Sequence, residues 1–317
     1  MIKFKSFLLE AEEAAKASGD NTALGAAYET ATALHLHNST GSKNNKDTEH
    51  VKRIQAMEKL HKEAMAKLPP EKQKAAVESG KRSAEAYMNS LKTNHGIDPK
   101  HVHEVHHTYA GIDHLVGKKV DRAGNPHDVA IKTKDGKIHG ASLKFKPGTL
   151  SNSTHNSFDK LAQQHGIDLN TKSHWDEHMK KAGLAGKSGK EIKAVRKDAK
   201  VLKLNTAAQN AAGAHHADAF NKADHSKVKK FMQSLMKSNP HTDYDYVVGS
   251  KGTSEPIKNK KHYQLVNKAK SFKFDHTGNG KVRVTDHAGN HLMTFEHRPT
   301  HGAFSSIQVN GKLGTAK

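Results

Sequence analysis

Residues 125–146 read NPHDVAIKTKDGKIHGASLKFK, and this stretch decides the fold that the sequence predicts. Val129 and Ile131 alternate with less apolar neighbours, which is the period of a half-buried strand. Asp135-Gly136 predicts a tight turn, because Gly accepts the positive φ that hairpin turns need. Apolar residues continue beyond the turn, so we predict two antiparallel strands joined as a hairpin.

Two polar side chains stand out in this hairpin. Asp128 begins the first strand and Lys144 lies near the end of the second. Antiparallel pairing can place them side by side, where a carboxylate can bind a divalent metal and a lysine can orient water or offset phosphoryl charge. The simpler alternative is a solvated cross-strand ion pair of little energetic weight.

An acid, a short hairpin and then small-x-Lys is the arrangement of the PD-(D/E)XK nuclease superfamily, which this stretch resembles through Asp128 and Ser142-Leu143-Lys144. The family usually has Asp or Glu where this chain has Ser142, and members that differ there recruit an acid from elsewhere. The resemblance implies an α+β fold with an α/β core, in which helices flank a mixed, restriction-endonuclease-like central sheet. It also implies a catalytic site of Asp128, Lys144, Glu29 and Ser142, with Mg²⁺ or Mn²⁺ held by Asp128, Glu29 and the Leu143 carbonyl.

Residues 21–37 predict a helix with one buried face, because Leu, Ala and Tyr residues repeat at spacings of three and four. Glu29 lies between apolar neighbours on this helix. The first core helix of the nuclease superfamily often carries a Glu that reaches the metal site, so Glu29 is the candidate for the missing acid. The alternative is a surface Glu on an Ala-rich helix.

The balance of charges favours a polyanionic partner. The chain of 317 residues carries a net charge of +20, and almost all of its 52 basic residues are Lys. Lys neutralises phosphates without reading bases well, so we expect salt-sensitive binding to the DNA backbone. The alternative is a Lys-rich surface with no partner. The candidate nucleic-acid contacts lie in the hairpin, in the polar loop expected after it and in the basic run 180–203: Lys132, Lys146, Ser151, Asn152, His155, Lys193, Arg196 and Lys197.

The composition also excludes several kinds of site. Without cysteine there are no disulfides, thiolate zinc sites or cysteine nucleophiles. No apolar run approaches a membrane span, and the N-terminus does not read as a secretory signal. The 26 histidines show no repeated metal-ligand spacing, and we expect most of them to be exposed.

The order of elements predicts a core with helical inserts and a C-terminal β-rich annex. Residues 18–250 form the predicted core, with helical inserts at 48–95 and 170–240. Tyr244–Val248 predicts a strand that extends the central sheet. Residues 262–317 predict a β-meander with Gly/Asn turns.

Residues 1–17 predict an amphipathic segment. It resembles the N-terminal targeting segment of internal head proteins of large tailed phages, in which a protease cuts after a Glu preceded two positions earlier by Leu, as in Leu8-Leu9-Glu10. That resemblance implies a location in the phage virion interior or the host cytoplasm and phage head proteins as partners. An ordinary amphipathic helix is the alternative.

These features lead to one expected function and two alternatives. The first is a phage-type, magnesium-dependent endonuclease, a hydrolase of DNA phosphodiesters that is packaged in the virion if the targeting resemblance holds. The second is a non-enzymatic, Lys-rich DNA-binding or internal head protein on a degenerate nuclease scaffold. The third is a virion structural protein that docks through its β-meander.

Overall fold

A computed structural model of the chain describes residues 20–108, 115, 127–145, 149–237, 244–299, 302–305 and 307–314. The predicted segment 1–17 and Lys146 lie outside these residues, and so do the side chains of Ser151 and Asn152.

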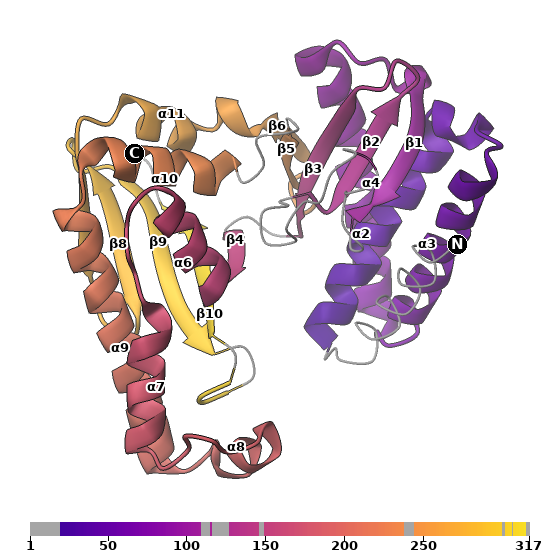
Figure 1. Ribbon diagram of the computed structural model, residues 1–317. Helices are drawn as coiled ribbons and strands as arrows, with labels where there is room; N and C mark the ends of the chain where they lie inside the picture. The colour runs from indigo at the N-terminus through magenta and orange to yellow at the C-terminus, as the bar shows by residue number, and fades with distance from the viewer. Residues whose placement is uncertain are drawn as a thin grey trace. The chain divides into compact units, whose positions relative to one another are not determined.

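The chain divides into two compact units (Figure 1). Unit 1 comprises Met1–Pro147 and Asn239–Ile257, and unit 2 comprises Gly148–Ser238 and Lys258–Lys317. Both hairpin strands fall in unit 1. The chain therefore leaves unit 1 after the hairpin, builds much of unit 2 and returns to unit 1 for two more strands.

Within the described residues, unit 1 combines three long helices with a sheet. Its helices are α2 (Asp20–Ser39), α3 (Thr48–Met65) and α4 (Pro70–His95), with two short 3-10 turns, η1 (Gly41–Asn44) and η2 (Pro99–His101). Its strands are β1 (Val102–His107), β2 (Val129–Thr133), β3 (Ile138–Lys144), β5 (Tyr244–Val248) and β6 (Thr253–Pro256).

The sheet of unit 1 is mixed, in the order β1-β2-β3-β5-β6. Strands β1, β2 and β3 run antiparallel, whereas β5 runs parallel to β3 with Ala141 opposite Asp245. The predictions of the hairpin and of Tyr244–Val248 as a strand of this sheet are confirmed. Strand β6 (Thr253–Pro256) pairs antiparallel with β5 and lies beyond the strands that the sequence predicted.

One apolar core holds the helices of unit 1 against the sheet. Leu36 of α2, Met57 of α3 and Leu91 of α4 belong to the same buried cluster as Ile131 of β2 and Val247 of β5. Figure 1 shows these helices gathered beside β1, β2 and β3. An α+β architecture with helices on a mixed sheet is therefore what the chain forms.

Unit 2 is built on a second, antiparallel sheet. Its strands, in the order β4-β10-β9-β8-β7, are β4 (Thr149–Thr154), β10 (Ile307–Leu313), β9 (His291–Pro299), β8 (Lys281–Asp286) and β7 (Phe272–His276). Its helices are α6 (His155–Gln164), α7 (Thr171–Lys181), α8 (Gly189–Val195), α9 (Ala199–Lys222), α10 (His225–Lys237) and α11 (Lys261–Lys268), with the turn η5 (Ile257–Asn259) at its border.

The C-terminal meander is confirmed, but its surroundings differ from the expectation. The helices between 170 and 240 pack with these strands: Phe220 of α9 stacks on Phe274 of β7 at 4.6 Å, and the Asn221 amide bonds both the N–H and the carbonyl of Phe274. The polar stretch 149–154, expected as a loop, is an edge strand that pairs with β10, a position where polar residues are tolerated.

The histidine prediction is wrong. Among the described histidines only His101 and His287 are exposed. Burial lowers the pKa of His127 to about 3 and that of His297 to about 4. His297 bonds His216 at 2.7 Å inside unit 2, so these rings serve packing and hydrogen bonding rather than surface charge. Among the helices that the structure describes, none is long and apolar enough to cross a membrane.

A partly buried ion network ties α3 to the sheet of unit 1. The Glu104 carboxylate of β1 lies 2.7 Å from Arg53, 3.0 Å from His106 and 3.8 Å from Lys132. The hydrogen bond with His106 is the main reason that the pKa of Glu104 falls from 4.5 to about 2, against the opposing effect of burial. Nearby Arg53 and Lys132 lower it further.

We expect Glu104→Gln to destabilise the protein at neutral pH and not at low pH. A carboxyl whose pKa is depressed by folding adds stability above its unfolded pKa, and this contribution is lost as the pH falls through the folded pKa. The loss at pH 7 should be about 2 kcal/mol and should shrink as the pH falls from 4.5 to about 2 in urea denaturation. Glu85→Gln, which removes an exposed pair with Lys81, should change little at either pH. An equal loss for Glu104→Gln at both pH values would contradict the assignment.

Candidate functional site

Asp128 and Lys144 meet at the end of the hairpin. The Lys144 ammonium lies 3.7 Å from Oδ2 of Asp128, and the two side chains are 22% and 27% exposed. The same oxygen accepts a hydrogen bond of 2.6 Å from the backbone N–H of Leu143. The carboxylate is therefore held by one backbone donor and one cation from the neighbouring strand.

Strand pairing fixes the backbone of Asp128 on both sides. Its N–H donates to the Ala141 carbonyl of β3 at 2.9 Å, and its carbonyl accepts from the N–H of Thr108, just after β1, at 3.1 Å. Continuing the β2–β3 register by one step places Asp128 opposite Ser142. Ser142 and Lys144 share one face of β3, because successive side chains alternate.

Glu29 approaches this end of the sheet from α2. Its Oε2 lies 3.2 Å from Nε2 of His107, the last residue of β1. Its charge also reaches Asp128, where it raises the pKa. The structure thus brings Glu29, Asp128 and Lys144 into one neighbourhood, with His107 as a further member that sequence reasoning did not assign to the site.

The environment of Asp128 opposes its ionisation. Burial raises its pKa from 3.8 to about 6, and the nearby charge of Glu29 acts in the same direction. Lys144, the Leu143 N–H and His107 act in the opposite direction without cancelling the rise. Burial and a neighbouring acid both disfavour the charged form of this carboxylate, so a bound cation would stabilise it.

Tyr28 positions the helix that carries Glu29. Its hydroxyl donates to the Lys144 carbonyl at 3.2 Å and shares a hydrogen bond of 2.7 Å with the Ser83 hydroxyl of α4. Its ring meets Phe145 edge-on at 5.5 Å. The sequence predicts Tyr28 as a core residue, but nothing in the local pattern reveals that its hydroxyl joins α2 to the end of β3.

Ser142 and Leu143 lie at the centre of the sheet. Ser142 is 2% exposed, and its hydroxyl cannot replace the carboxylate that the nuclease pattern has there. Leu143 packs its side chain into the core of unit 1, while its N–H serves Asp128. A second acid beside Asp128 would have to come from outside β3, and the charge of Glu29 is near enough to raise the pKa of Asp128.

The residues expected to contact nucleic acid are spread over both units. Lys132 lies in unit 1 and is partly neutralised by Glu104 at 3.8 Å. His155 begins α6 and is half-buried, whereas Lys193 and Lys197 are exposed at α8 and just beyond it. Arg196 is half-buried. The basic run 180–203 is the end of α7, all of α8 and the start of α9, not one helix or arm.

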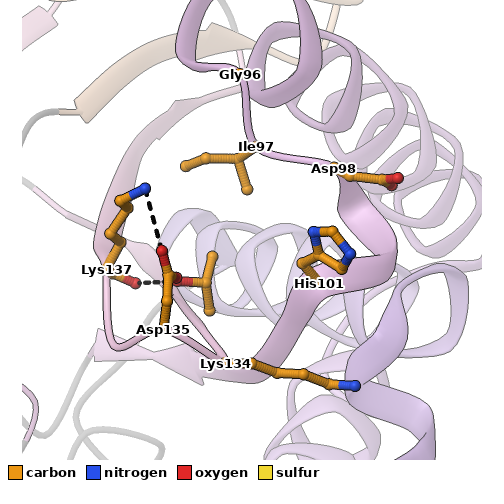
Figure 2. A pocket seen from close by; sticks show the side chains of 8 residues that line it. Gly96, Ile97, Asp98, His101, Lys134, Asp135 and Lys137 are labelled. Atoms are coloured by element: carbon orange, nitrogen blue, oxygen red, sulfur yellow. Dashed lines mark hydrogen bonds and ion pairs between the residues drawn. The ribbon is translucent and has the colours of Figure 1, made fainter.

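A pocket of about 390 Å³ opens at the other end of the hairpin (Figure 2). In Figure 2, Ile97 lies over it between Lys137 on one side and His101 on the other. Asp135 and Lys137 form an ion pair of 3.1 Å on its rim. The pocket is formed around the β2–β3 turn, whereas Asp128 and Lys144 lie at the opposite ends of these strands, so it is separate from the carboxylate site.

No family model, curated protein or solved structure matches the chain.

We expect Asp128→Asn to stabilise the protein at alkaline pH. A carboxyl whose pKa is raised by folding contributes its full stability below the unfolded pKa, and this is lost as the pH rises through about 6. Asn can still accept from Leu143 and carries no charge to bury. Its free energy of unfolding should exceed that of the wild type by about 1–2 kcal/mol at pH 8. The free energies of unfolding of the two proteins, measured by urea denaturation, should become equal near pH 4. A variant less stable than the wild type at pH 8 would contradict the raised pKa of Asp128.

Proposed function

We propose that the protein is a metal-dependent DNA endonuclease of the PD-(D/E)XK kind, with a restriction-endonuclease-like core in unit 1. The observation that carries the proposal is the ion pair between Asp128 before β2 and Lys144 of β3, with Glu29 of α2 close enough for its charge to raise the pKa of Asp128. These are the acid, the hairpin and the lysine of the superfamily pattern, with the helix carboxylate replacing the acid that Ser142 lacks.

The donor set suits Mg²⁺ or Mn²⁺. The Leu143 N–H bonds one oxygen of the Asp128 carboxylate, and His107 bonds one oxygen of the Glu29 carboxylate. Each carboxylate therefore has a second oxygen that can bind a hard cation. The Leu143 carbonyl is the third proposed ligand. A bound ion would supply a water of lowered pKa and would offset the charge of the phosphoryl group.

Lys144 is the proposed catalytic cation. Its ammonium lies beside Asp128, where it can orient the attacking water and stabilise charge that develops on the phosphate oxygens. Ser142 shares the face of β3 that carries Lys144, but it is 2% exposed, so its hydroxyl is placed to support the site rather than to contact a substrate oxygen.

DNA is the proposed substrate, bound through its backbone. The net charge of +20 and the exposed Lys193 and Lys197 support phosphate contacts. The predicted targeting segment 1–17 supports a place in the phage virion with head proteins as partners, or in the host cytoplasm after delivery. We expect segment 1–17 to be cut after Glu10 if the protein is packaged, so a virion-derived chain would begin at Ala11.

A non-enzymatic, DNA-coating protein is the second candidate. Ser142 favours this candidate, because the superfamily pattern has a metal-binding Asp or Glu at this position and Ser has no carboxylate. The excess of Lys would serve both candidates equally. Only cleavage separates them, since both are expected to bind DNA.

We expect Asp128→Asn and Lys144→Ala each to lower Mg²⁺-dependent nicking or cutting of plasmid DNA by at least about 100-fold. Glu29→Gln should do the same if Glu29 is the second acid. Binding to a labelled duplex, measured by fluorescence anisotropy without metal, should change by no more than about threefold, because most phosphate contacts lie elsewhere.

The hairpin supplies its own controls for this experiment. Asp135 and Lys137 form an exposed ion pair at the turn of the same hairpin, with side chains 59% and 72% exposed. Asp135→Asn and Lys137→Ala should leave cutting unchanged. Wild-type protein that cuts no more in Mg²⁺ than in EDTA would favour the DNA-coating protein, and unimpaired cutting by Asp128→Asn and Lys144→Ala would end the nuclease assignment.

A further inference from the structure

A second cluster of metal-ligand types lies elsewhere in unit 1, at His95, His139 and Asp245. His95 is the last residue of α4, His139 is the second residue of β3 and Asp245 is the second residue of β5. One donor atom from each side chain lies within 4.8 Å of the others. The cluster is distinct from the Asp128 site, because His139 is five positions before Lys144 along β3.

His139 and Asp245 are buried, His95 is half-buried, and the three side chains already lie close together. Nε2 of His95 lies 2.8 Å from Oδ1 of Asp245, and Nε2 of His139 lies 3.8 Å from the same oxygen. The side chains of His95, His139 and Asp245 are 14%, 5% and 0% exposed. Strand pairing explains part of this, because Ala141 lies opposite Asp245, and His139 projects from the same face of β3 as Ala141.

Hydrogen bonds outside the cluster orient these ligands. The Tyr87 hydroxyl lies 2.8 Å from Nδ1 of His139 and donates to the His139 carbonyl at 3.1 Å. Because that one proton goes to the carbonyl, the hydroxyl oxygen accepts from Nδ1–H, and the lone pair of His139 lies on Nε2, the nitrogen turned toward Asp245. Ser254 donates to Oδ2 of Asp245 at 2.6 Å, which leaves Oδ1 directed at the histidines.

The donor atoms of the cluster are about as far apart as the ligands of a transition-metal ion. Two ligands at about 2.0–2.1 Å from a tetrahedral ion are about 3.3 Å apart. The distances from Oδ1 of Asp245 to the two histidine nitrogens, 2.8 Å and 3.8 Å, lie on either side of that value, and all three donor atoms lie within 4.8 Å of one another. Outer hydrogen bonds to both histidine and carboxylate ligands are typical of protein metal sites.

We propose that His95, His139 and Asp245 bind one divalent transition-metal ion of the zinc class, which fastens the end of α4 to strands β3 and β5. Two imidazoles and one carboxylate suit zinc and its neighbours better than Mg²⁺, which prefers oxygen ligands alone. The burial of the cluster leaves little room for a substrate, so the ion serves structure rather than catalysis. The proposal is independent of the nuclease assignment.

The competing reading is a metal-free anchor. Burial raises the pKa of Asp245, but hydrogen bonds from His95, Ser254 and Ser90 outweigh burial and hold the pKa below its usual value. An ionised Asp245 bonded to His95 would join α4 to β5 without any ion. Metal binding must therefore be measured directly.

The test uses the full chain, stripped of metal with a chelator and titrated with Co²⁺ and then Zn²⁺. We compare the wild type with His95→Gln, which keeps an N–H donor for Asp245, and with Asp245→Asn. The matched control is His35→Gln, since His35 is another half-buried helical histidine of unit 1 that lies outside the cluster. Circular dichroism confirms that each variant is folded.

We expect the wild type and His35→Gln to take up one tightly bound Co²⁺ with the visible absorption of a four-coordinate site, which Zn²⁺ then displaces. His95→Gln should bind that equivalent at least about tenfold more weakly, and Zn²⁺ should raise its melting temperature less than that of the wild type. If Asp245→Asn does not fold, His95→Gln alone decides. Equal affinity and equal stoichiometry in His95→Gln and the wild type would overturn the proposal and establish the metal-free anchor.

Discussion

The carboxylate of Asp128 is held where ionisation is unfavourable, and the rest of the proposed chemistry depends on that constraint. Burial and the negative charge of Glu29 oppose its charged form, while one backbone N–H and one lysine only partly compensate. An uncharged side chain at position 128 could accept the same hydrogen bond from Leu143 without the unfavourable charge, so stability alone does not explain an Asp there. Strain of this kind gathers where a cation or a substrate completes the site.

The fold maintains that constraint through register. The backbone of Asp128 is bonded on one side to β3 and on the other to the residue that follows β1, so it cannot move without breaking these sheet hydrogen bonds. A slip of one residue between β2 and β3 would carry Lys144 to the opposite face. Helix α2 is fixed to the same place by the Tyr28 hydroxyl, which bonds the carbonyl of Lys144 and thereby sets the distance of Glu29 from the hairpin. The site is thus built by three strands and one helix of a single unit.

Local patterns predicted the parts of this arrangement that depend on neighbours in sequence. The Asp135-Gly136 turn and the alternation after Asp128 give the hairpin, and the apolar stripe around Glu29 gives the helix. Local sequence patterns do not show which helix faces pack on which strands. The contact between His95 and Asp245 joins residues 150 positions apart, and Tyr28 reaches Lys144 across 116 positions. The expectation that residues 149–154 form a loop failed because pairing with β10, more than 150 residues further along the chain, stabilises a polar strand.

The central claim is that Glu29, Asp128 and Lys144 form one site for a divalent cation. It is tested most directly by carbon NMR of the full chain with labelled aspartate side-chain carboxyls, in which the Asp128 signal is assigned from its loss in Asp128→Asn. The account predicts a titration midpoint near pH 6 that moves to lower pH when Mg²⁺ is added, and a signal that substoichiometric Mn²⁺ broadens before that of the exposed Asp135. A midpoint near 4 that neither Mg²⁺ nor Mn²⁺ affects would contradict the account.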